Sequence, residues 1–276
     1  MAEISAAAVK ALRERTGLPM MECKKALEAT AGDPDAAIEV LRKAGKKAVG
    51  GREHKETAFG RIGVYVDFAG GRSGMAELLC ESAPVAAHPE FVELAGDLAR
   101  QLAVGAGAAS GDELLGQPAP SQPGKTLREV FDDLNIRIRE AFRVGRLARV
   151  EGPCGGYVHH DGTKAVLLEV QGGSPELAKE ICMHVVAMRP LAVARDELDL
   201  GLVAKEREIL TEQTRGEGKP EKMIPKIVEG RMRAFYSQHC LVDQPFVKDA
   251  NQTVGKVAEA GGMKIVRFVR WELGKE

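Results

Sequence analysis

A change of hydrophobic period near residue 60 limits most strongly how this chain can fold. Before it, apolar residues recur at the spacing of one helical face, as do Ile4, Ala7, Ala8, Ala11 and Leu12. After Arg61, apolar residues alternate with others at Ile62, Val64 and Val66, as in a half-buried strand. The sequence therefore predicts an α+β fold that begins with a separate helical section.

The helical section divides into three short helices. Glycines such as Gly17 stop the first two, and Asp33-Pro34 is a typical N-cap and first-turn pair for the third. We expect a small three-helix module over residues 1–45. A polar, glycine-containing run without any period predicts a linker over residues 46–56.

The rest of the chain predicts two α+β units with the same order of elements, over residues 57–145 and 146–276. The expected elements are a β-hairpin over 61–80, a helix over 89–104, a loop over 104–124, a helix from 125, strand material over 138–150, hairpin arms at 156–159 and 165–170, a helix over 175–188 and a strand over 264–273.

Residues 198–238 differ from both units. Leu202/Ile209 and Val203/Leu210 pair seven residues apart, and apolar residues resume after a break near Gly216. We interpret this segment as an antiparallel helical hairpin inserted in the second unit.

Composition excludes several classes of function. The 39 basic and 40 acidic residues give a net charge of -1, which disfavours binding to nucleic-acid backbones. There is no apolar run long enough to span a bilayer and no export signal at the start, so we expect a cytoplasmic protein without membrane contact. The five cysteines are scattered singly, as in a reduced compartment.

Motifs for catalysis are missing from the sequence. It has no phosphate-binding P-loop, no nucleophile elbow and no zinc-protease motif. His159-His160-Asp161 could suggest a metal site, but a hairpin turn is the better interpretation because no further ligand lies nearby in sequence. Met21 is different: it falls on the polar side of its helix, where an exposed methionine suits a binding surface.

Several segments resemble the elongation factor Ts family. The first is VKALRERTGLPMMECKKAL at Val9–Leu27; GYVHH at Gly156–His160, MHVVAMRP at Met183–Pro190, EGRMRAF and QPFVKD follow in the family's order. The resemblance implies a ubiquitin-associated-like N-terminal module, a core of two subdomains and a helical hairpin, which often mediates homodimer contacts in the family.

The resemblance also implies a function without catalytic residues, cofactor or metal: exchange of nucleotide on the GTPase elongation factor Tu, by distortion of its phosphate and magnesium site. The residues that it assigns to the contact are Arg13, Met20, Met21, Ser82, Ala83, Pro84, Val85 and His159. The chain departs from the family at Ser82-Ala83-Pro84-Val85-Ala86, where Thr-Asp-Phe-Val-Ala is usual.

Three alternatives remain open. The module could be a ubiquitin-associated-type binding module in a scaffold without exchange activity. The chain could bind elongation factor Tu with weakened exchange, because the aspartate and phenylalanine are replaced. It could also be an enzyme whose site the sequence conceals, and such an enzyme would turn over a substrate without any partner.

Overall fold

The computed structural model of the protein describes residues 4–52 and 54–275, without the side chains of residues 46–49. Its internal contacts divide the chain into two compact units. The first holds the residues up to Gly63 and Met75–Leu147, and the second holds Val64–Gly74 and everything from Ala148 onward. The chain combines helices and sheets, in agreement with the predicted α+β class. The finer division into a ubiquitin-associated-like module and two core subdomains stays a prediction.

Three helices open the first unit: α1 (Ala6–Thr16), α2 (Met20–Ala29) and α3 (Pro34–Gly50). Ser5 caps α1 by accepting a hydrogen bond from the Ala8 N–H, and Gly17 ends it in the left-handed region at φ 67°. Their buried faces share one core, formed by Val9, Leu12, Leu18, Cys23, Ala26, Leu27, Ala37, Leu41 and Ile136. Ile136 comes from a later helix, so the three helices do not pack as an isolated module.

Helix α3 corrects one boundary, because it continues to Gly50 and takes in the first five residues of the predicted linker. The sequence there has no apolar period, but lysine and alanine are strong helix formers. Gly45 packs so closely on Ile136 that an added Cβ would lie 2.3 Å from its Cγ2. Helix α3 therefore contacts a distant helix at the residue that precedes the predicted linker.

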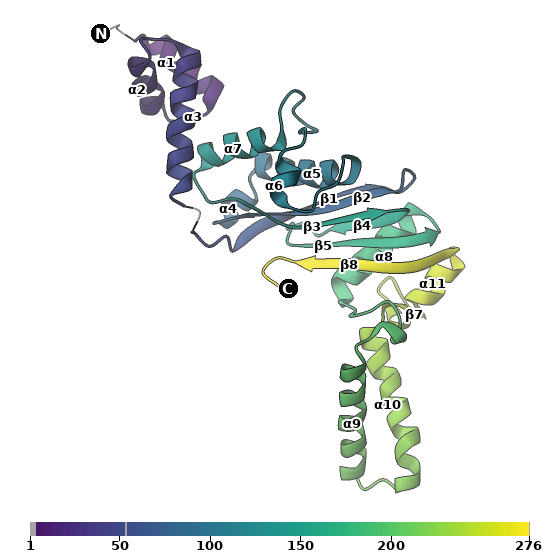
Figure 1. Ribbon diagram of the computed structural model, residues 1–276. Coiled ribbons are helices and arrows are strands. Elements are labelled where there is room, and N and C mark those ends of the chain that lie inside the picture. Colours follow the sequence, from purple (N-terminus) through teal and green to yellow (C-terminus); the bar gives the residue numbers. More distant parts are fainter. Residues whose placement is uncertain (1–3, 53, 276) are drawn as a thin grey trace. The chain divides into compact units, whose positions relative to one another are not determined.

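The remainder of the first unit packs helices beside a sheet (Figure 1). The three-stranded sheet has the order β1-β2-β3, from β1 (Phe59–Asp67), β2 (Arg72–Cys80) and β3 (Arg143–Glu151). The first unit holds residues 59–63, 75–80 and 143–147 of these strands, and their other residues belong to the second unit. The helices are α4 (Ala83–Ala86), α5 (Pro89–Val104), α6 (Gly111–Leu115) and α7 (Leu127–Ile138). The predicted hairpin, α5 and α7 are present, whereas α4 and α6 were not predicted and the expected strand material from residue 138 begins only at Arg143.

The second unit is built on an antiparallel sheet of order β4-β5-β8, from β4 (Cys154–Val158), β5 (Lys164–Gly172) and β8 (Met263–Glu272). Helix α8 (Pro175–Met188) packs on β4 and β5 through a buried face that includes Ile181, Cys182 and Val185. Three further elements were not predicted: β6 (Pro245–Phe246), β7 (Asp249–Thr253) and α11 (Val254–Ala260).

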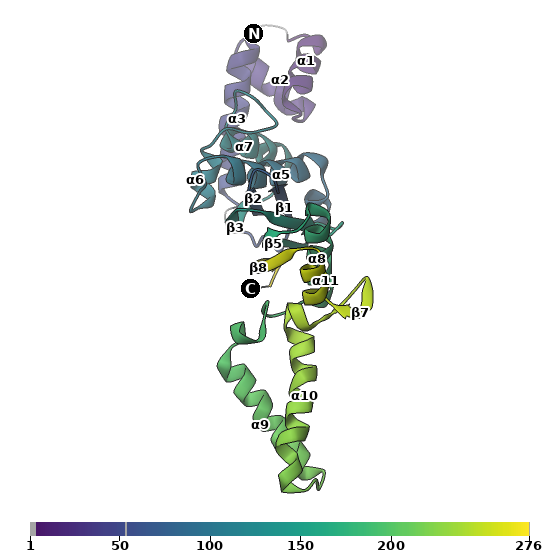
Figure 2. The same cartoon turned by 90° about the vertical axis from the view of Figure 1, so that its right-hand side faces the viewer.

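The predicted hairpin is formed by α9 (Leu200–Gly216) and α10 (Ile224–His239), which pack side by side (Figure 2). Short 3-10 helices flank them at Arg195–Glu197, Glu221–Met223 and Leu241–Asp243. Val203 and Leu210 face the shared core, but Leu202 and Ile209 are each 38% exposed. Only one of the two predicted heptad pairs therefore lies in the seam.

His184 shows how the second unit is tied together at α8. Its side chain is fully buried; Nδ1 accepts a hydrogen bond from the Val247 N–H at 3.1 Å, and Nε2 lies 2.9 Å from Oε1 of Gln244. An accepting Nδ1 requires the neutral ring. Burial lowers the pKa of His184, although the hydrogen bond with Gln244 raises it in part. The residue therefore has a structural role.

No helix among residues 4–52 and 54–275 is both long enough and apolar enough to cross a membrane.

Candidate functional site

The first group of candidate residues lies on the surface of α1 and α2. The side chain of Arg13 is exposed in the last turn of α1, and Met20 and Met21 begin α2 with exposed fractions of 49% and 62%. The sequence places them there because Cys23 and Leu27 occupy the buried face of α2. The predicted exposure of Met21 is confirmed.

The second group, Ser82–Val85, lies in a short helix rather than in an open loop. Ser82 is the N-cap residue of α4 and its side chain does not cap that helix. Instead the Ser82 N–H and hydroxyl both donate to the carboxylate of Glu140, at 3.0 and 2.6 Å. Ala83 and Pro84 are exposed and Val85 is half-buried. The segment is thus a rigid helical turn with two small apolar residues on its surface.

Glu81 fixes the other side of this segment. Its carboxylate accepts hydrogen bonds from Nε and Nη2 of Arg52 at 3.0 and 3.1 Å and from the Ala141 N–H at 2.6 Å. The bonds from Arg52 and then from Ala141 hold the pKa of Glu81 below its ordinary value. A charged carboxylate with a bidentate arginine partner has a defined geometry, so the position of Glu81 directly before Ser82 is restrained.

His159 belongs to the second unit, in the turn between β4 and β5. Its Nδ1 lies 3.2 Å from Oδ2 of Asp161, and its ring centroid lies 4.2 Å from that of His160. Burial alone would raise the pKa of Asp161, but hydrogen bonds from the N–H and hydroxyl of Thr163, together with His159, lower it to about 2. These contacts form the hairpin turn that the sequence predicts for residues 159–161.

Within the described ranges, no group of three or more His, Cys, Asp or Glu side chains is arranged to hold a metal ion.

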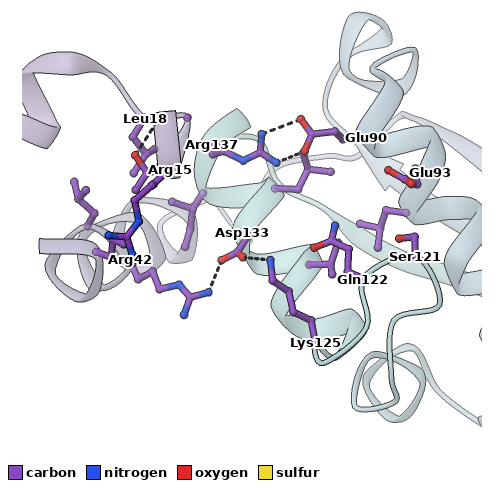
Figure 3. Close-up of a pocket in the computed structure, with 18 of the residues that line it drawn as sticks. Arg15, Leu18, Arg42, Glu90, Glu93, Ser121, Gln122, Lys125, Asp133 and Arg137 are labelled. Atoms are coloured by element: carbon purple, nitrogen blue, oxygen red, sulfur yellow. Dashed lines mark hydrogen bonds and ion pairs between the residues drawn. The ribbon is translucent and has the colours of Figure 1, made fainter. Parts of the chain in front are cut away.

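The candidate residues lie outside the main cavity of the first unit. A cavity of about 680 Å³ in the first unit is lined by α1, α3, α5 and α7 and is crossed by ion pairs of Asp133 with Arg42 and Lys125 and of Arg137 with Glu90 (Figure 3). None of the eight candidates lines it.

The candidates therefore lie at the surface and away from this cavity, a placement suited to contact with another macromolecule rather than to enclosing a small substrate. Arg13, Met20, Met21 and Ser82–Val85 lie in the first unit, and His159 lies in the second. Two further residues beside these patches, Arg139 and Glu140, have no motif and no period that would have identified them from the sequence.

Comparison with known proteins supplies the family. A model of the family described as Elongation factor TS matches residues 84–275, which is more than half of the chain. The chain belongs to the elongation factor Ts family. Similar relatives are the proteins named Elongation factor Ts of Saccharopolyspora erythraea, 41% identical over the full length of both chains, and of Methylococcus capsulatus, 40% identical over 99% of this chain and 92% of the relative.

A third relative, the Elongation factor Ts of Thioalkalivibrio sulfidiphilus, is 39% identical over 99% of this chain and 92% of its own length. The similarity to these relatives also covers the residues of the N-terminal helices, which precede the residues that the family model matches. The relationship to the elongation factor Ts family therefore extends to the N-terminal helices.

Proposed function

We propose that this elongation factor Ts homologue is the nucleotide-exchange factor of its cell for elongation factor Tu, and that it releases GDP by binding the GTPase. The observation that carries the proposal is the full-length similarity to proteins named Elongation factor Ts. The relation is thermodynamic: a factor that binds the empty GTPase more tightly than the GDP-bound GTPase must lower the affinity for GDP by the same factor.

The proposed mechanism requires shape complementarity and no covalent step. A GTPase holds phosphate through backbone N–H groups and a helix N-terminus, so a wedge that shifts these groups by a small distance weakens the grip on the nucleotide. Two features support a wedge built from the first unit. The turn at Ser82–Val85 is held by Glu140 and Glu81, and its outer residues Ala83 and Pro84 are exposed.

The surface of α1 and α2 would supply apolar contact to the same partner. Met20 and Met21 are exposed at consecutive positions at the start of α2, and full burial of a methionine side chain contributes about 1.5–3 kcal/mol. Arg13 would add a charged contact at the edge of this patch. His159 would contact a second region of the GTPase from its hairpin turn, where Asp161 and Thr163 hold the backbone.

The test measures release of fluorescent GDP from purified elongation factor Tu of the same organism. The protein should accelerate release in a concentration-dependent, saturable manner, and catalytic amounts should suffice. Release that stays at the spontaneous rate across a wide concentration range would refute the proposal. Tight binding without acceleration would instead favour the alternative of a binder with weakened exchange, which the replacement at Ala83 and Pro84 makes worth testing directly.

We further propose that the hairpin of α9 and α10 mediates homodimer contacts. Leu200, Leu202, Ile209 and Met223 leave apolar surface exposed on it, with Leu200 82% exposed. Sedimentation at micromolar concentration tests this. A Leu202→Glu variant should be monomeric if the proposal holds, and a wild-type protein that sediments as a monomer would overturn it.

A further inference from the structure

The end of helix α7 has an unusual backbone conformation. Arg139, its C-cap residue, has φ 64°, a left-handed conformation that residues with a side chain adopt infrequently. Two hydrogen bonds with Asn135 stabilise this conformation. The Arg139 N–H donates to the Asn135 carbonyl at 2.7 Å, and the buried Asn135 side chain donates to the Glu140 carbonyl at 2.9 Å. The chain therefore turns sharply between Ile138 and Glu140.

This turn directs two consecutive side chains to two different segments. Arg139 forms an ion pair with Glu22, which follows Met21 in α2. Glu140 accepts both the N–H and the hydroxyl of Ser82, the residue that begins the proposed wedge. The next residue, Ala141, donates to Glu81. Residues 139–141 therefore contact both surface segments of the first unit that the proposed function assigns to the GTPase.

We propose that Arg139 and Glu140 are positioning residues that fix the α2 surface relative to the Ser82–Val85 turn, so that both engage the GTPase as one rigid surface. This inference rests on the proposed exchange function. Neither residue needs to contact the partner. Their effect follows from geometry, because exchange requires the wedge to enter while α2 stays bound, and a misplacement of one segment weakens that combined contact.

The contact between Arg139 and Glu22 is well suited to a separable test. Their side chains are 43% and 38% exposed, and ion pairs this exposed contribute little to folding stability. Arg139→Gly removes the side chain and suits the left-handed backbone, because glycine adopts that conformation without strain. Arg189→Gly is a matched control: Arg189 is the left-handed C-cap of α8, at φ 51°, and belongs to the second unit.

The experiment measures saturation curves of GDP release for wild type, Arg139→Gly, Glu22→Gln and the double variant, with melting temperatures. Each single variant should lower the maximal exchange rate by about three- to tenfold, and the double variant should be no slower than the slower single variant. Arg139→Lys should keep most of the activity because it keeps the charge. Melting temperatures should change little, and Arg189→Gly should exchange at the wild-type rate.

Outcomes that would overturn the inference are distinct from failure of the proposed function. A wild-type protein that does not accelerate release refutes the function itself. If wild type is active, an unchanged rate for Arg139→Gly refutes the positioning role. Independent, multiplicative losses in Arg139→Gly and Glu22→Gln also refute it, because two residues that act through one contact cannot contribute separately. A loss of rate that follows a lowered melting temperature would show a merely structural role.

Discussion

Met21→Lys tests the proposed contact surface of α2. The side chain of Met21 is 62% exposed, so this fraction is available for burial against a partner. With about 1.5–3 kcal/mol for a fully buried methionine, the contact contributes at most about 1–2 kcal/mol, which corresponds to roughly a five- to thirtyfold change in Kd. Lysine removes the contact and adds the cost of desolvating an ammonium group, so the loss should lie at or above this range.

The assay is a titration of nucleotide-free elongation factor Tu with wild type and variant, together with thermal unfolding of each protein. An exposed site contributes little to the fold, so Met21→Lys should unfold within about 0.5 kcal/mol of wild type while binding weakens. Val40→Lys is the matched control, because Val40 is an exposed apolar residue of α3, 40% exposed, and is not assigned to the contact. It should affect neither property.

Three results would refute the reasoning. An unchanged Kd for Met21→Lys would remove α2 from the interface. A fall in stability comparable to that of a core substitution, which costs about 2–5 kcal/mol for Leu→Ala, would show that the side chain packs within the fold. Equal weakening by Val40→Lys would attribute the effect to added charge on the module rather than to a local contact.

Other predictions concern the wedge, the hairpin and the buried histidine. Pro84→Ala should reduce cognate exchange only a few-fold, because its small ring buries little apolar area, and abolished GDP release would contradict this. The protein should also act poorly on an elongation factor Tu whose own partner has the Asp-Phe wedge, and full-speed exchange there would be the opposing result. Replacing residues 206–230 with a short Gly-Ser linker should leave a cooperative unfolding transition, whereas an insoluble product would assign the hairpin to the core. The pKa of His184 is lowered from its ordinary value of 6.5, so the unfolded chain takes up the proton first as the pH falls below 6.5. Denaturant unfolding at pH 7.5 and 5.5 should therefore show a loss of stability on acidification that is smaller in His184→Gln; an equal loss in both proteins would exclude this residue as the cause.

Helices with a continuous apolar stripe could be predicted closely from the sequence. The helices over 89–104 and 175–188 agree with α5 and α8 at both ends, because proline and a preceding N-cap position mark their starts and their buried faces repeat at helical spacing. The strands of the first hairpin could be predicted equally well, since alternation and a glycine turn are local signals. In such cases the local pattern and the packing agree.

Elements determined by distant contacts were missed or shortened. Helix α3 continues to Gly50 beyond its last apolar period, and no pattern near residue 45 encodes the contact of Gly45 with Ile136. The short elements β6, β7 and α11 were missed because strands of two to five residues and a seven-residue helix contain too few apolar positions for a period to be recognised. Leu202 and Ile209 were wrongly predicted to lie between the two helices of the hairpin, because a seven-residue spacing does not say which face of a helix meets its partner helix.

In the candidate site, too, features set by local sequence could be predicted and features set by distant contacts could not. The exposure of Met21 follows from the buried face of its own helix and needs no distant information. The partners of the Ser82–Val85 turn could not be predicted, because Glu140 lies 58 positions from Ser82, and Arg139 lies 117 positions from Glu22. Ion pairs over such separations depend on the packed fold and leave no periodic trace in the sequence.

The anchoring of Ser82 also bears on the proposed wedge, where Ala83 and Pro84 stand at the positions for which the resemblance to the family implies aspartate and phenylalanine. Phenylalanine would supply a large apolar body, whereas Ala83 and Pro84 expose only small apolar groups. A smaller wedge displaces its target less unless it is held more firmly, because part of the contact energy is lost in ordering a mobile turn. Here the two residues that precede α4 are both held by hydrogen bonds. Glu81 is bound to Arg52 and Ala141, and Ser82 is bound to Glu140. Proline adds a fixed φ within the first turn of α4. Rigidity rather than bulk is therefore the property on which exchange by this chain should depend, and variants that loosen Glu140 should impair it more than variants that shrink Pro84.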